Sequence, residues 1–256
     1  MKTKIIILGC GSSVGVPRID GFWGNCLKSN KKNYRTRCSA IIVKGSNSIL
    51  IDTSPDIRKQ FLKNKIQNLT SVIYTHEHAD QTNGLFELRP FLWKNKKKLN
   101  VYGNLKTINH LKLRQDYLFK KISQYPPIVK ANKVKKKFSL GKGDEKISFE
   151  TLSAKHGKTK SVIYIFENLA YISDCNDLTI VDKKELQNLK ILIIDCLRYK
   201  KHPTHFNLSD ALFVHRHLKP QKTILTNLHS DLDYKYLLRK LPKSVLPAYD
   251  GMKLFL

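Results

Sequence analysis

The sequence predicts a layered α/β fold in which helices cover β-sheets on the outside. Short apolar runs rich in Ile and Val recur along the whole chain and are typical of strands. Segments with helical spacing lie between them, and paired strand-like runs return in the middle of the chain. With 256 residues the chain is long enough to bury a large core, so we expect one domain spanning residues 1–256.

The predicted elements follow from these patterns in chain order. The predicted strands are 4–8, 39–43, 48–51, 71–74, 99–102, 147–152, 162–166, 169–172, 191–194, 223–225 and 252–256. The predicted helices are 55–63, 85–93, 105–118, 208–218 and 234–241. Ser54 and Pro55 are expected to cap and open the first helix. The lysine-rich segments 94–98 and 133–137 are expected to be solvated turns.

The chain is strongly basic, with 47 Lys and Arg against 20 Asp and Glu and a formal charge of +27. Such a field attracts polyanions, which favours a phosphate-bearing substrate. Lysine can also accumulate on solvated surfaces without a function, and composition does not separate the two explanations.

Cysteine usage and hydropathy point to an unexported protein. The five cysteines are odd in number and contain no C-x-x-C pair, which argues against a disulfide framework or a zinc ribbon and favours the reducing cytoplasm. The apolar run 5–8 ends at Gly9, before a signal-peptide core would be complete. No other run approaches the length of a membrane span, so we expect no membrane partner.

Residues 75–80 carry the strongest chemical signal. His76, His78 and Asp80 alternate directly after an apolar strand, where the chain runs into a loop. Two imidazoles at this spacing can approach one ion when the loop curls, and the carboxylate adds a hard oxygen ligand. This pattern predicts a metal site.

Three further candidate ligands follow other predicted strands: His156, Asp174 and His229. Each could be an ordinary loop residue on its own. Their repeated placement at strand ends favours ligands brought together from distant parts of the chain.

Together these motifs resemble the metallo-β-lactamase fold superfamily of hydrolases. Further similarity lies in the segments 8–17, 51–55 and 80–85. The branch that the chain resembles most contains the phosphoribosyl cyclic phosphate phosphodiesterases and neighbours the tRNA 3′-processing endonucleases. The resemblance implies a four-layer αβ/βα sandwich, with two β-sheets packed face to face and helices outside. It also implies two divalent metal ions, zinc or manganese, with iron as a further candidate.

Carried over by position, the resemblance assigns His76, His78 and His156 to one ion. It assigns Asp80 and His229 to the second ion. Histidine and carboxylate ligands suit several metals, so the sequence does not identify the metal.

The remaining implied positions include one departure from the superfamily. Asp174 would bridge the two ions. Asp52 would orient a metal ligand without itself contacting an ion. The superfamily usually has a histidine after the last aspartate of the motif, whereas here that position is Gln81, a weaker and neutral ligand. The second ion is therefore expected to bind loosely, or with a water in place of the missing imidazole. Cys26 and Cys38 are too few for an additional structural zinc site, and we expect none.

The implied reaction is hydrolysis of a phosphodiester. Two close ions lower the pKa of a shared water and hold the phosphoryl oxygens. Asp80 and His205 are the predicted catalytic residues, because His205 resembles the family histidine that contacts phosphate and acts as an acid. His202 competes for that role, and Arg198 is a further candidate phosphate contact. Asn207 is expected to cap the helix that follows.

Three alternatives remain beside this interpretation. A dinucleotide-binding fold is disfavoured, because Gly9 and Gly11 are not followed by the required third glycine and Pro17 stands where a helix should begin. These glycines instead predict a tight loop beside the metal site. A ribonuclease acting on RNA or tRNA 3′ ends is the second alternative, and a non-catalytic metal or nucleic-acid binding protein is the third. A small cyclic or nucleotide-like diester is preferred over RNA, because no long inserted arm is evident between Asn83 and Lys155. A homodimer is a further candidate assembly.

Overall fold

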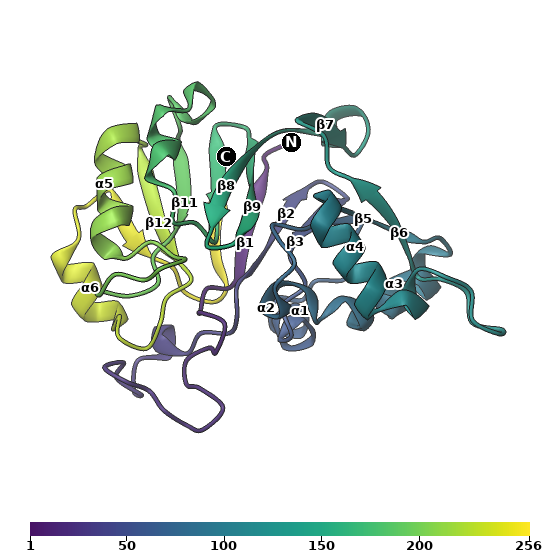
Figure 1. Ribbon diagram of the computed structural model, residues 1–256, viewed down its shortest axis with the longest axis horizontal. Helices are drawn as coiled ribbons and strands as arrows, with labels where there is room; N and C mark the ends of the chain where they lie inside the picture. The colour runs from purple at the N-terminus through teal and green to yellow at the C-terminus, as the bar shows by residue number, and fades with distance from the viewer.

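The computed structural model describes residues 1–256 and contains two seven-stranded sheets that face each other (Figure 1). The strands of the first sheet are, in spatial order, β14 (Met252–Phe255), β1 (Lys4–Gly9), β2 (Ser39–Lys44), β3 (Asn47–Ile51), β4 (Ser71–Ile73), β5 (Leu99–Gly103) and β6 (Val129–Lys133). Those of the second are β13 (Val245–Pro247), β12 (Lys222–Thr226), β11 (Ile191–Asp195), β10 (Leu169–Ile172), β9 (Thr159–Phe166), β8 (Ile147–His156) and β7 (Lys137–Leu140).

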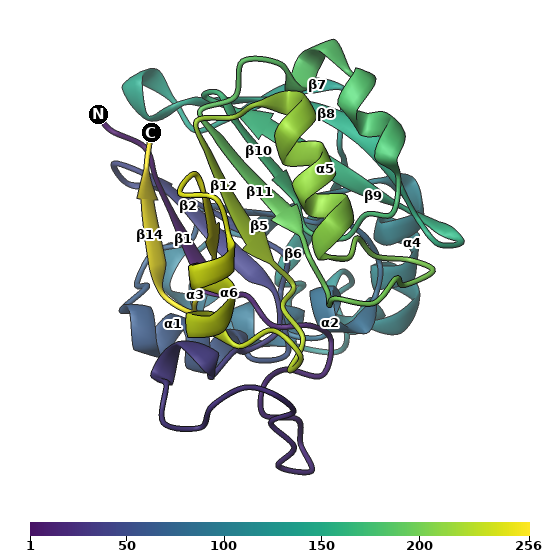
Figure 2. The same ribbon diagram turned by 90° about the vertical axis from the view of Figure 1, so that its left-hand side faces the viewer.

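Helices cover the outer face of each sheet, which confirms the predicted four-layer sandwich (Figures 1 and 2). The helices on the side of the first sheet are α1 (Ile57–Asn64), α3 (Arg89–Asn95) and α4 (Leu105–Arg114), with the single turn α2 (Ala79–Thr82) after the loop that follows β4. The helices on the side of the second sheet are α5 (Leu208–Leu218) and α6 (Tyr234–Lys240). No helix is both long enough and apolar enough to cross a membrane.

Successive side chains of each strand point to opposite faces of its sheet, and together they form three apolar layers. In β3, Ile49 and Ile51 face the second sheet, whereas Leu50 between them joins the cluster beneath α1 and α4. In β11, Ile193 faces the first sheet and Leu192 packs under α5. Because both faces of these strands are covered, their sequences are continuously apolar.

Three strands were not predicted, and all three lie at or beside sheet edges. β6, β7 and β13 are all edge strands: β6 contains two lysines, β7 begins with Lys137, and β13 ends in Pro247. Edge strands tolerate charged residues and proline, because one side of their backbone needs no partner. The segment 133–137, predicted as a solvated turn, forms the connection between β6 and β7 at residues 134–136, whereas its first residue ends β6 and its last begins β7.

Helix boundaries differ from the predictions at both ends, and the predicted helix 105–118 ends at Arg114, followed by a 3₁₀ turn, Asp116–Leu118. The first helix begins at Ile57 rather than at Pro55, and Ser54 accepts from the Asp56 backbone N–H over 3.1 Å instead of capping the helix. The predicted helix 85–93 divides into a 3₁₀ turn, Leu85–Leu88, and α3. The prediction of 208–218 is confirmed, including a capping box at Asn207.

Candidate metal centre

The ends of five strands converge on one side of the molecule. β10, β11 and β12 are parallel and in register, so the residues that follow them reach the same edge of the second sheet. Asp174 follows β10, Asp195 ends β11 and Asn227 follows β12. The loop after β4 and the end of β8 approach the same place from the first and second sheets and carry three histidines.

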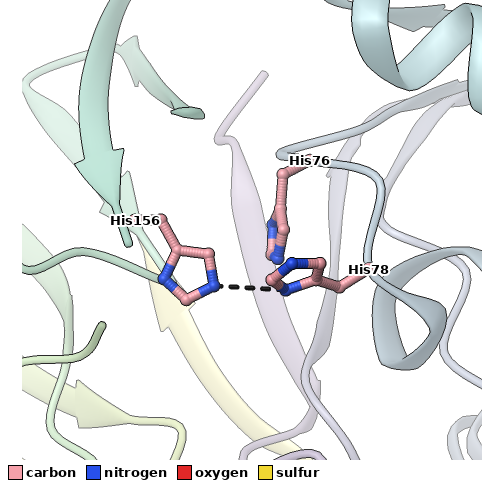
Figure 3. Close-up of side chains that lie close together, drawn as sticks. All are labelled: His76, His78 and His156. Carbon is pink, nitrogen blue, oxygen red and sulfur yellow. Dashed lines mark hydrogen bonds between the residues drawn. The ribbon is translucent and has the colours of Figure 1, made fainter. Parts of the chain in front are cut away.

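His76, His78 and His156 form a compact group (Figure 3). One ring nitrogen from each lies within 4.8 Å of the others, and His156 Nε2 lies 3.2 Å from His78 Nδ1. Burial lowers the pKa of His76 to about 3, so its ring is neutral and can donate a lone pair. The structure thus brings together the three residues that the resemblance assigns to one ion.

Hydrogen bonds behind this group fix the orientation of two rings. His156 Nδ1 donates to the backbone oxygen of Thr204 over 2.7 Å. His76 Nδ1 lies 3.0 Å from Thr75 Oγ1, which itself donates to Asp52 Oδ2 over 2.8 Å. Both rings therefore keep Nε2 free of a proton, as metal-binding histidines require. Asp52 acts through Thr75 rather than by touching a ligand.

Orphaned buried atoms show that the site fits cations. His76 Nε2, Asp174 Oδ2 and Gln81 Oε1 are buried without a hydrogen-bond partner. An unpaired buried polar atom costs about 1–3 kcal/mol, and coordination to a metal would remove this cost. Three imidazoles form a donor set that suits zinc, and manganese or iron are also compatible.

A second group joins His156 to Asp174 and His205, whose ligand atoms also lie within 4.8 Å of one another. His205 Nδ1 donates to Asp195 Oδ2 over 2.8 Å. Although burial acts to lower the pKa of His205, the charge of Asp195 prevails and raises it to about 9. Asp195 was not predicted as a site residue, although it ends an apolar strand in the same way that Asp174 follows one.

Asp80 and Gln81 lie beside these groups. Burial, and then the negative charge of Asp174, raise the pKa of Asp80 to about 6. Gln81 Nε2 donates to Asp80 Oδ2 over 3.2 Å. One buried and one half-buried carboxylate that repel each other, next to an unpaired amide oxygen, form an oxygen-rich position that a hard cation would stabilise.

The structure does not bring His229 into either group. Its Nδ1 pairs with Asp231 Oδ1 at 2.9 Å, and its backbone N–H donates to Leu197. Asn227, two residues earlier, instead donates through Nδ2 to Asp174 Oδ1 at 3.3 Å and to Asp195 Oδ1 at 3.1 Å. The assignment of His229 to the second ion thus gains no support from this geometry, and sequence reasoning missed Asn227.

The two weaker candidates for phosphate contact differ in position. The ring of His202 lies 5.2 Å from that of His205, measured between centroids, so it borders the site. Arg198 folds back onto its own loop, where it donates to the backbone oxygens of Lys200 and Lys201. In this conformation its guanidinium stabilises its own loop.

The predicted glycine loop packs near the centre. Gly11 donates to the Thr36 oxygen and bridges to Leu228, which follows Asn227. A Cβ on Gly9 would lie 2.1 Å from the Arg37 carbonyl oxygen, so only glycine allows this approach.

Residues 47–227 match the family model of the β-lactamase superfamily domain. This chain belongs to the β-lactamase superfamily. The matched segment contains His76, His78, His156, Asp174 and His205 and ends at Asn227.

Solved structures place this superfamily member in the metallo-β-lactamase fold and its PhnP-like branch, as the sequence motifs predict. A diphosphatase of the PhnP family is 30% identical, with a TM-score of 0.88 over 100% of this chain and 98% of that chain. Human tRNase Z, short form, is 15% identical, with a TM-score of 0.68 over 98% of each chain, and shows the shared fold. Zn²⁺-bound PqqB from Methylobacterium extorquens is 16% identical, with a TM-score of 0.74 over 99% of this chain and 100% of that chain.

A curated relative carries a different name. It is an octanoyltransferase from Porphyromonas gingivalis (strain ATCC BAA-308 / W83), 31% identical over 256 residues. The match covers 98% of this chain but only 51% of that protein. The chain therefore spans about half the length of the relative.

Proposed function

We propose that this superfamily member is a metal-dependent phosphodiesterase. The observation that carries the proposal is the convergence of three imidazoles on one point, directly beside Asp174 and a histidine, His205, whose ring is held by Asp195. The 30% identical diphosphatase of the PhnP family supports hydrolysis at phosphorus.

His76, His78 and His156 would hold the first ion, and Asp80, Asp174 and Gln81 would surround the second. Zinc or manganese bound there would supply hydroxide near neutral pH and positive charge for the phosphoryl oxygens. Asp174 lies between the two groups and leaves Oδ2 without a protein partner.

His205 would donate a proton to the leaving alkoxide. Its Nδ1 is held by Asp195, which leaves Nε2 as the donor. A positioned acid of this kind contributes on the order of 10²- to 10⁴-fold in rate. Asp195 is a positioning residue, since it fixes the ring and stabilises its charged form.

A cytoplasmic location is part of the same proposal. All five cysteines are free and buried, as suits a reducing compartment.

Hydrolysis of bis-p-nitrophenyl phosphate, before and after chelation, tests the proposed activity. Turnover should stop on chelation and return with manganese or zinc. The His76→Ala variant should show no turnover. The His217→Ala variant, changed at an exposed histidine on α5, should retain turnover. Absence of turnover with every metal would favour a non-catalytic binding protein.

A further inference from the structure

A groove lined by lysines adjoins the metal centre. It has a volume of about 500 Å³ and lies between the start of α4, the β6–β7 connection and the β8–β9 hairpin. Its cationic side chains are Lys106, Lys135, Lys136, Lys158 and Lys160, and no carboxylate lines it.

Two of these lysines are neutralised and three are not. Lys106 Nζ lies 2.7 Å from Glu77, and Lys136 Nζ lies 3.5 Å from Glu185. Lys135, Lys158 and Lys160 are exposed and have no carboxylate within 4.0 Å, since none of them takes part in an ion pair. The groove therefore keeps three uncompensated positive charges on two separate segments.

One end of the groove touches the ion-binding loop. Glu77 stands between His76 and His78 and accepts from Thr159 Oγ1 over 2.6 Å, and Thr159 lines the groove. The β8–β9 hairpin that carries Lys158 and Lys160 also carries His156, the last residue of β8. In Figure 2 this hairpin lies beside α4, where Lys106 Nζ donates to Thr159 Oγ1 over 2.9 Å. A chain lying in the groove would thus lead to the three histidines.

We propose that this groove binds the backbone of a single-stranded oligonucleotide and guides it to the metal centre. The proposal rests on the proposed phosphodiesterase function and names its substrate class. A polymer of phosphodiesters can occupy several separated lysines and still present a linkage of the type that the centre cleaves. No aromatic side chain lines the groove, so base stacking is absent and binding depends on phosphate contacts without sequence preference. The groove therefore favours an oligonucleotide over a small diester as the substrate.

The test compares two variants with the same change in charge. The groove variant combines Lys135→Glu, Lys158→Glu and Lys160→Glu. The control combines Lys183→Glu, Lys222→Glu and Lys243→Glu, three exposed lysines outside the groove and without ion pairs. Fluorescence anisotropy with a labelled oligouridylate measures affinity across a salt series in the presence of a chelator, which prevents cleavage, and a gel confirms that the oligonucleotide stays intact. Thermal unfolding confirms that both variants fold.

The groove variant should bind at least about tenfold more weakly than the control. Its plot of log affinity against log salt should be less steep than that of the wild type by about 2, at about 0.7 per lost phosphate contact with a single strand. Lys158→Gln alone should weaken binding by a few-fold. Equal weakening in the two triple variants, or no binding by the wild type, would overturn the proposal.

Turnover of bis-p-nitrophenyl phosphate by the wild type distinguishes this proposal from the one on which it rests. Turnover without oligonucleotide binding would overturn the proposed role of the groove and leave the proposed phosphodiesterase activity standing. Neither turnover nor oligonucleotide binding would overturn both.

Discussion

His205 and Asp195 form a buried pair in which the ring Nδ1 donates to the carboxylate over 2.8 Å. Asp195 also accepts the backbone N–H of Cys175 at 3.1 Å and the side-chain amide of Asn227 at 3.1 Å. These contacts hold the carboxylate at the end of β11 and direct its charge to one histidine. The relationship links a strand end of the second sheet to the proposed proton donor.

Asp195→Asn should lower the pKa of His205 from its value of about 9. The Asp195 carboxylate stabilises the protonated ring, and its removal leaves burial, which favours the neutral ring, opposed only by the charges of Asp174 and Asp80. Histidine NMR titration of the metal-free protein measures the shift. Asp144→Asn, at an exposed position, should leave the titration unchanged. An unaltered pKa in Asp195→Asn would show that the pair does not tune His205.

His205→Gln should slow cleavage most where the leaving group is poor. An alkoxide needs a proton from His205, whereas p-nitrophenolate leaves without one. We expect a loss on the order of 10²-fold or more with an alkyl diester and a much smaller loss with bis-p-nitrophenyl phosphate, as measured by kcat for each. Equal losses with both substrates would exclude a role as general acid.

Gln81→His should raise the affinity of the protein for the second metal ion. Imidazole is a stronger ligand for zinc than an amide oxygen, so we expect affinity to rise by at least about tenfold, or about 1.4 kcal/mol. Isothermal titration of protein already loaded with one ion measures this affinity. Gln67→His places the same ring at an exposed site and should change nothing. If both variants match the wild type, Gln81 does not lie at a metal position.

The cysteines should be unreactive in the folded protein. Burial raises the pKa of the Cys10, Cys38 and Cys196 thiols well above the usual range, and only the thiolate attacks. At pH 8 Ellman's reagent should react on the order of 100-fold more slowly with native than with unfolded protein, in which all five thiols are released. Rapid reaction of the native protein would contradict this burial.

Local patterns were sufficient to predict most of the sandwich. Buried strands such as β3 and β11 are apolar on both faces, which a sequence displays directly. β6 and β7 were missed because the backbone partners of an edge strand, and not its side chains, define it. A lysine-rich edge strand therefore looks like a turn.

The three histidines proposed to hold the first metal ion were predictable from the sequence. The residues around the proposed second ion were not. His76 and His78 share one short motif, and His156 follows from placement at a strand end. Both Asn227 and His229 follow β12 in the sequence. Histidine is the more common metal ligand, and His229 was therefore predicted as the ligand. Asn227 has a positive φ of 62°, and the backbone bonds of the next residues turn His229 towards Asp231. That turn depends on contacts with distant loops, which local spacing does not reveal.

Metal content per chain, measured by elemental analysis after dialysis against metal-free buffer, tests the central claim most directly. We expect one ion to remain in the wild type, a second to be taken up when manganese is added, and the retained ion to be lost in His156→Ala. His217→Ala should match the wild type. A wild-type protein that retains no ion and takes up none would contradict the metal centre and the phosphodiesterase built on it.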